Sequence, residues 1–154
     1  MSRIIILDSG VLSLVTKPNK KALEDRAAAR WAVDLLAAGH RIVVPAIADY
    51  EVRRELVRSG STRSILALDT WNDAEPGRFL DLTSGDLRLA CQLWARARNA
   101  GTPTADPKAL DGDVLIAAQA LNLDLSRSDF IVATTNVAHL SLFVPADRWT
   151  NITP

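Results

Sequence analysis

The chain has 154 residues, of which 48% are hydrophobic and 23% are charged, a composition typical of one globular domain rather than of a disordered or fibrous chain. Its one cysteine, Cys91, excludes an internal disulfide and a thiolate-rich zinc site. No apolar run approaches the roughly 20 residues of a membrane span, and the apolar start is too short for a signal peptide, so we expect a single cytoplasmic domain over residues 1–154.

Basic and acidic residues balance over the whole chain, at 18 each, but the two signs are divided unevenly. Residues 1–63 contain 11 basic and 7 acidic residues, and residues 64–154 contain the reverse. A net charge of zero argues against a nucleic-acid partner, whereas a basic half beside an acidic half would suit a phosphate-facing surface next to a metal site. Chance segregation on a solvated surface explains the division equally well.

Apolar runs and helical spacings predict an alternation of strands and helices. In chain order, the expected elements are a strand (3–7), a turn into a helix (8–10), a loop (17–21), a helix (22–38), a strand (41–44), two helices (46–58 and 62–72), a short strand (78–82), a helix (83–99), a loop (101–107), a helix (110–121), a strand (130–134) and a candidate last strand (140–144). This alternation predicts an α/β fold with a parallel sheet covered by helices on both faces.

Functional residues of open α/β sheets lie beyond the carboxyl ends of the strands. Asp8 directly follows the first strand, Glu51 lies in the helix after the second, Asp113 begins the helix at 110–121, and Asn136 follows the strand at 130–134. Each has a simpler explanation when taken alone: a helix cap for Asp8, a solvated face for Glu51, a favourable helix start for Asp113 and a turn for Asn136.

Taken together, these oxygen donors at one sheet edge indicate a cation, because clustered carboxylates repel one another without one. Mg²⁺ and Mn²⁺ prefer carboxylate and water oxygens, and phosphodiester hydrolysis is the chemistry that such an ion would support. Asp111 lies two residues from Asp113 and therefore points in a different direction on the helix. We expect Asp113 to bind the metal and Asp111 to cap the helix or support the ligands from outside.

Four segments resemble the motifs of PIN domains, in the same order along nearly the whole chain. They are IIILDSGVL at residues 4–12, VPAIADYEV at 44–52, DVLIAAQA at 113–120 and ATTNVAHL at 133–140. The resemblance implies a three-layer α/β/α sandwich and a metal-dependent endoribonuclease, with Asp8, Glu51 and Asp113 as the carboxylates. The fourth family position, often Asp, is Asn136 here, which weakens a second metal site, and Thr134 is a plausible neighbour of the site.

Many single-domain PIN proteins are VapC-type toxins, so the resemblance also implies a homodimer, an RNA substrate and a small antitoxin that inhibits the chain. A catalytically impaired PIN-like module that binds RNA or protein is the alternative, and Asn136 favours it. A haloacid-dehalogenase-like phosphatase is disfavoured because Gly10 stands where that family has its second Asp.

Several surface and core expectations accompany this hypothesis. We expect Cys91, Trp31 and Trp94 to be buried and Trp71 to be exposed at an edge. Basic residues near the second acidic motif and in the loop at 17–21 are candidates to hold phosphates, although a solvated face explains the arginines at least as well. These candidates are Arg53, Arg54, Arg58, Lys17, Lys20 and Lys21.

Overall fold

The computed structural model describes residues 2–101 and 107–154, without the side chains of residues 107–110. Most of the loop expected at 101–107 therefore lies outside the described residues. Within them, five parallel strands form one sheet in the order β3-β2-β1-β4-β5. The strands are β1 (Ile4–Leu7), β2 (Arg41–Pro45), β3 (Phe79–Leu80), β4 (Phe130–Thr134) and β5 (Ala146–Arg148).

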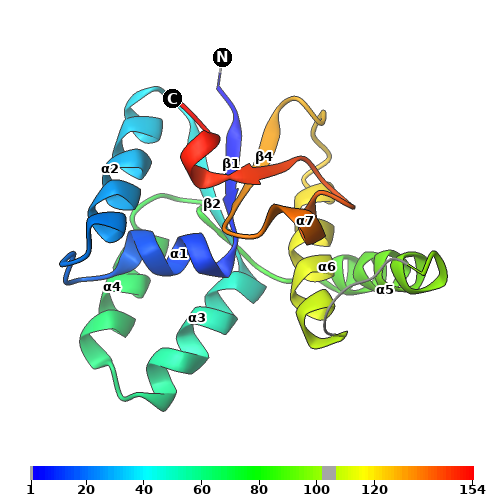
Figure 1. The fold of residues 1–154 in the computed structure, drawn as a ribbon, viewed down its shortest axis with the longest axis horizontal. Coiled ribbons are helices and arrows are strands. Elements are labelled where there is room, and N and C mark those ends of the chain that lie inside the picture. The colour runs from blue at the N-terminus through cyan, green and yellow to red at the C-terminus, as the bar shows by residue number, and fades with distance from the viewer. Residues whose placement is uncertain (1, 102–106) are drawn as a thin grey trace.

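Helices connect the strands and cover both faces of the sheet (Figure 1). They are α1 (Ser9–Thr16), α2 (Leu23–Ala37), α3 (Ala46–Arg58), α4 (Thr62–Asp73), α5 (Ser84–Asn99), α6 (Pro107–Leu121) and α7 (Val137–Leu140), with a short 3-10 helix at Trp149–Asn151. The predicted three-layer sandwich with a central parallel sheet is confirmed.

Alternation along the strands divides the core in two, because successive side chains of a strand point to opposite faces. Ile5 and Leu7 of β1 pack with α1, α2 and the helices beside them, whereas Ile6 packs with α5 and α6 on the other face. All three side chains are fully buried. This burial on both faces explains why β1 is a continuous apolar run rather than an alternating one.

The candidate strand at 140–144 is wrong, because the last strand is β5, two residues further on. Leu140 ends α7, and the amide of Val144 donates to the carbonyl of Leu140 at 3.1 Å. Both side chains are buried against the α6 face of the sheet. A spacing of four residues places two apolar side chains on one side of a helical turn, so the same pattern fits a turn as well as a strand.

The exposure of α5 also differs from expectation. Cys91 and Trp94 are exposed, although we expected both to be buried. Trp31 is buried, as expected, and packs edge-to-face on Trp149 with ring centres 5.6 Å apart. Trp71 is half-buried rather than exposed. None of the helices in the described part of the chain has the length and apolar character needed to cross a membrane.

Candidate active site

Asp8 stands where β1 ends and α1 begins, and both of its carboxylate oxygens accept hydrogen bonds. The backbone amide of Val11 donates to Oδ1 at 2.9 Å, which caps α1, and the Thr134 hydroxyl donates to Oδ2 at 2.5 Å. Burial raises the pKa of Asp8, while the hydrogen bond from Thr134 and those from nearby backbone amides lower it. The simple cap role and a site role are therefore compatible in this residue.

Thr134 ends β4 and is fully buried. Its hydroxyl also accepts a hydrogen bond from the backbone amide of Asn136 at 2.9 Å, so the turn after β4 fixes the orientation of the group that holds Asp8. The Asn136 side chain is exposed and makes no capping hydrogen bond to α7. Asn136 is therefore linked to Asp8 indirectly: its backbone amide donates to the Thr134 hydroxyl, which in turn donates to Asp8.

Glu51 lies on α3, half-buried, with its carboxylate against the backbone of α6. A Cβ atom at Gly112 would stand 2.9 Å from Oε1 of Glu51, closer than real side chains tolerate. Glycine at this helix position therefore provides the room that Glu51 occupies. Burial raises the pKa of Glu51, the nearby Arg54 guanidinium lowers it, and the Asp8 carboxylate raises it again.

Asp113 follows Gly112 on α6. Its carboxylate therefore lies on the same stretch of α6 that the Glu51 carboxylate approaches from α3. Its Oδ2 lies 3.3 Å from Nδ1 of His139 on α7. Burial raises the pKa of Asp113 to about 6; His139 opposes that rise, and the negative charges of Asp8 and Glu51 add to it. The protonation of Asp113 therefore depends on both other carboxylates.

Asp8 raises the pKa of Glu51, and both raise the pKa of Asp113, so the three carboxylates are linked electrostatically. Hard oxygen donors whose charges repel one another suit Mg²⁺ or Mn²⁺. Within the described residues, however, no three Asp, Glu, His or Cys side chains stand close enough to share one ion. A cation here would be held by fewer side chains and by water, as Mg²⁺ usually is.

Asp111 lies away from this group, although one expectation from the sequence was that it supports the metal ligands from outside. Its side chain is exposed and lines a groove between α5 and α6 with Leu87, Cys91 and Trp94. Two residues along a helix correspond to about 200° of rotation, so Asp111 and Asp113 project to different sides of α6. The structure does not bring Asp111 to the carboxylate group.

Two contributors to the site were missed from the sequence. His40 and His139 do not lie at metal-ligand spacing in the sequence, and the contact of His139 with Asp113 depends on how α7 packs beside α6. Gly112 gave a usable signal, because glycine within a helix costs about 1 kcal/mol relative to alanine and so indicates close packing. The sequence Asp111-Gly112-Asp113 contained that signal.

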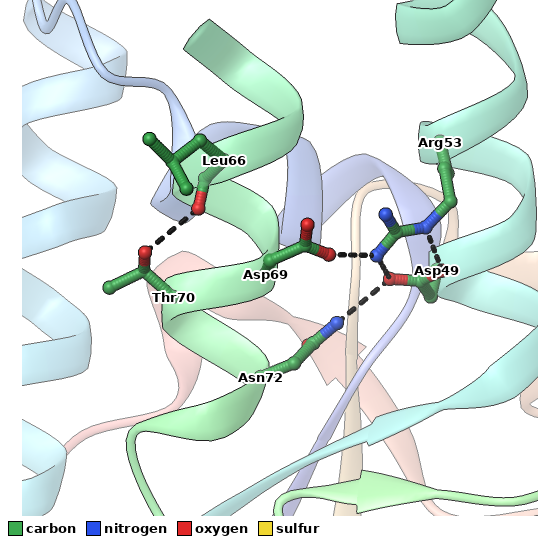
Figure 2. Close-up of polar contacts among 6 residues, drawn as sticks. All are labelled: Asp49, Arg53, Leu66, Asp69, Thr70 and Asn72. Atoms are coloured by element: carbon green, nitrogen blue, oxygen red, sulfur yellow. Dashed lines mark hydrogen bonds and ion pairs between the residues drawn. The ribbon is translucent and has the colours of Figure 1, made fainter. Parts of the chain in front are cut away.

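A second acidic group links α3 to α4 (Figure 2). Its α3 residues, Asp49 and Arg53, are each two positions from Glu51 and therefore about 200° around the helix from it. Arg53 donates to both oxygens of Asp49, at 2.8 and 3.0 Å, and to Asp69 of α4 at 2.7 Å. Asn72 donates a further hydrogen bond to Asp49 at 2.8 Å. Asp49 is buried, so this network joins α3 to α4 through an internally neutralised carboxylate.

The comparison with protein families agrees with this arrangement. The model of the PIN domain matches residues 5–136, which include Asp8, Glu51, Asp113 and Asn136. The chain belongs to the PIN domain family. No curated protein sequence matches this PIN domain closely enough to be counted.

Solved structures show the same fold over nearly the whole PIN domain. FitAcB from Neisseria gonorrhoeae is similar, with 19% identity, a TM-score of 0.66, and coverage of 96% of this chain and 99% of that chain. VapBC2 from Rickettsia felis, bound to a DNA fragment from their promoter, has 16% identity, a TM-score of 0.67, and coverage of 95% and 98%. VapBC-1 from nontypeable Haemophilus influenzae has 16% identity, a TM-score of 0.62, and coverage of 96% and 99%. At these identities the likeness concerns the fold.

Proposed function

We propose that this PIN domain is an endoribonuclease that depends on Mg²⁺ or Mn²⁺ and acts as the toxin of a toxin–antitoxin pair. The observation that carries the proposal is the placement of three carboxylates: Asp8 directly after β1, Glu51 against Gly112 of α6, and Asp113 next to Gly112, with Asp8 and Glu51 both raising the pKa of Asp113. Their positions within the PIN match, and the likeness of the fold to FitAcB and VapBC structures, support it.

Each carboxylate has a distinct part in the proposed reaction. Asp8 and Asp113 would bind the cation, Glu51 would bind it or orient the attacking water, and Asn136 would add a neutral oxygen. The ion would polarise a phosphoryl oxygen and activate water for hydrolysis. Thr134 and the Val11 amide hold Asp8 in one orientation, which favours a fixed ligand geometry.

A cleavage assay with paired variants tests the enzyme. The chain should cleave RNA with Mg²⁺ or Mn²⁺ and stop when EDTA removes the metal. Asp113→Asn should lower the rate at least about a hundredfold, the scale on which lost charge stabilisation acts in active sites. Asp111→Asn is the matched control, since it removes the same charge two residues away, and it should keep nearly full activity. A fully active Asp113→Asn variant would remove Asp113 from the site and favour the alternative of a binding module.

Expression of the chain tests the toxin and its partners. We expect growth arrest when the chain is expressed alone, rescue by a small protein encoded beside it, and copurification of the two. An antitoxin could place an arginine among the three carboxylates and displace the cation. Light scattering should give the mass of a homodimer. Normal growth and no small partner would leave a nuclease without a toxin role.

A further inference from the structure

A small cavity lies at the amino edge of the sheet, at the opposite end of the strands from the carboxylate group. Arg41 begins β2 and Arg78 directly precedes β3, so both stand where parallel strands start. Together with His40 and Glu75, they line a cavity of about 180 Å³ beside the end of α2. None of the residues that line it belongs to the candidate active site.

Arg78 is a buried arginine that has no carboxylate partner among the described residues. It is 3% exposed, and its guanidinium carbon lies 4.4 Å from the ring centre of Trp71. Its Nη1 donates to the carbonyl of Trp71 at 2.9 Å, whereas its Nε is buried without a hydrogen-bond acceptor in the described part of the chain. Burial lowers the pKa of Arg78 and Glu75 raises it, but a guanidinium keeps its charge at neutral pH. A buried charge left unpaired is costly, so a counter-ion would be favourable here.

Two further N–H donors border the same cavity. The Arg41 side chain is exposed, and a Cβ atom at Gly77 would stand 3.3 Å from its Nη2, so this guanidinium lies against the loop before Arg78. His40 is buried, and its Nδ1 accepts a hydrogen bond from the backbone amide of Arg3 at 3.0 Å. An Nδ1 that accepts leaves the ring proton on Nε2, so His40 is also a donor.

We propose that Arg41, Arg78 and His40 form a binding site for a phosphate group at the amino edge of the sheet. Neither arginine pairs with a carboxylate within the residues that the structure describes, so both charges are available. This site is separate from the proposed nuclease and does not depend on it.

Charge and size favour phosphate as the occupant. Two guanidinium charges match the nearly two negative charges of a phosphate group at neutral pH, and each planar fork can donate in pairs to its oxygens. A carboxylate has one charge and two oxygens, so it would leave donors unused. The cavity is smaller than the roughly 300 Å³ that drug-sized ligands need, which limits the occupant to a group of about this size.

Glu75 gives the proposal a prediction of opposite sign. Its side chain is exposed, lines the cavity and lies near enough to Arg78 to raise the pKa of that residue. An anion in the cavity would be repelled by this carboxylate. Glu75→Gln should therefore tighten phosphate binding, whereas Arg41→Gln should weaken it. If Glu75 were only the internal counter-charge of the arginines, neither change would act on phosphate.

Isothermal titration calorimetry with inorganic phosphate tests the site in the full chain. EDTA is present throughout, because carboxylates without a metal repel the ion and do not compete for it. We expect saturable binding that Arg41→Gln weakens about tenfold or more, the scale of one charge-assisted hydrogen bond. Glu75→Gln should strengthen it severalfold. Arg78→Lys keeps the charge without the fork and should weaken binding; if this buried variant does not fold, the two surface variants decide.

Matched controls separate a built site from general effects of charge and salt. Arg63 on α4 is exposed and does not line this cavity, so Arg63→Gln should leave phosphate affinity unchanged. Chloride keeps the ionic strength constant, and acetate and glycerol 3-phosphate are titrated in parallel. If glycerol 3-phosphate binds with the same dependence on Arg41, the site accepts a phosphate monoester. If only inorganic phosphate binds, the site takes the free ion, and both results support the proposal.

The outcomes also distinguish this site from the nuclease. Phosphate affinity that Arg41→Gln leaves unchanged overturns the site, and so does acetate binding as tight as that of phosphate. The absence of saturable binding up to about 10 mM phosphate, ten times a dissociation constant of about 1 mM, overturns it as well. Because the titrations contain neither metal nor RNA, a chain that cleaves no RNA but binds phosphate through Arg41 supports this site and overturns only the nuclease.

Discussion

Two groups of carboxylates include residues of α3, and they differ in whether the chain itself supplies a cation to neutralise them. Asp49 and Asp69 surround Arg53, whose guanidinium supplies the counter-charge from within the chain, and this pairing raises the pKa of Arg53. Asp8, Glu51 and Asp113 repel one another, and burial raises the pKa of each. A carboxylate with a fixed cation joins helices, whereas carboxylates left without one retain the capacity to bind an ion from solution.

The largest effect that we expect is on stability, from Arg53→Met. This change leaves the buried Asp49 without its cation, and removing one partner of such a pair costs about 3 kcal/mol, at the low end for buried pairs because Arg53 is partly exposed. Urea unfolding followed by circular dichroism measures the loss.

Arg54→Met is the control for this prediction, because it removes the same group from the neighbouring residue. Its free energy of unfolding should change by no more than about 0.5 kcal/mol, as for surface substitutions elsewhere. Equal losses from the two variants would contradict the division of α3 into a structural face and an open face.

A second prediction concerns Gly112, where a methyl group should act on activity and stability in opposite directions. Gly112→Ala should displace the Glu51 carboxylate, since the new Cβ would stand 2.9 Å from Oε1. Moving a catalytic group by about 1 Å can lower the rate about a hundredfold. The helix itself should gain up to about 1 kcal/mol, because alanine is the better helix former.

Cleavage rates and thermal unfolding of the same preparation check both halves of the Gly112 prediction. Gly85→Ala on α5 is a suitable control, because its Cβ would have 3.6 Å to its nearest neighbour and would displace nothing. Full activity of Gly112→Ala would mean that the position of Glu51 against α6 does not matter for the reaction.

The smallest expected effect is the pH dependence of stability that Asp113 contributes. Its pKa in the folded chain is about 6, above the ordinary 3.8, so the folded state binds more protons than the unfolded state between these values. Stability should therefore fall as pH rises from about 4 to 6 and stay lower above that range. Asp113→Asn lacks this loss. Its free energy of unfolding at pH 7 should therefore exceed that of wild type by up to about 2 kcal/mol, after the loss of the His139 contact is subtracted.

Unfolding in EDTA at several pH values tests this difference, and contributions shared by both proteins cancel when the two are compared. The gain of Asp113→Asn should shrink toward zero near pH 4. Mg²⁺ should narrow this gain at pH 7: at ten times its dissociation constant, it would stabilise wild type by about 1.4 kcal/mol and the variant less. A gain that persists at pH 4 would show that charge is not its cause.

The sequence predicted the parts of the site that depend on topology. Asp8 follows β1 and Thr134 ends β4, and these neighbouring parallel strands end at one edge of the sheet, so the strand order brings the two residues together. Asp113 could be distinguished from Asp111 because helical rotation separates residues two positions apart.

Packing between helices decided what the sequence left open. The contact of His139 with Asp113 depends on the placement of α7 beside α6, which periodicity does not encode. The apolar pair Leu140 and Val144 fits a turn or a strand, and only its burial against α6 decides between them. Trp94 and Cys91 are exposed because the groove between α5 and α6 leaves one side of α5 uncovered, a feature that an apolar pattern cannot reveal.

The hydrogen bond from Thr134 to Asp8 has a consequence for the order of synthesis. It joins residues 126 positions apart, and β1 pairs directly with β4, so a nascent chain contains Asp8 long before the group that orients it. Residues 130–134 of β4 must be translated before the central strands can pair. The carboxylate group proposed to cleave RNA therefore cannot be completed before β4 has been translated, because Asp8 is oriented by Thr134 of that strand.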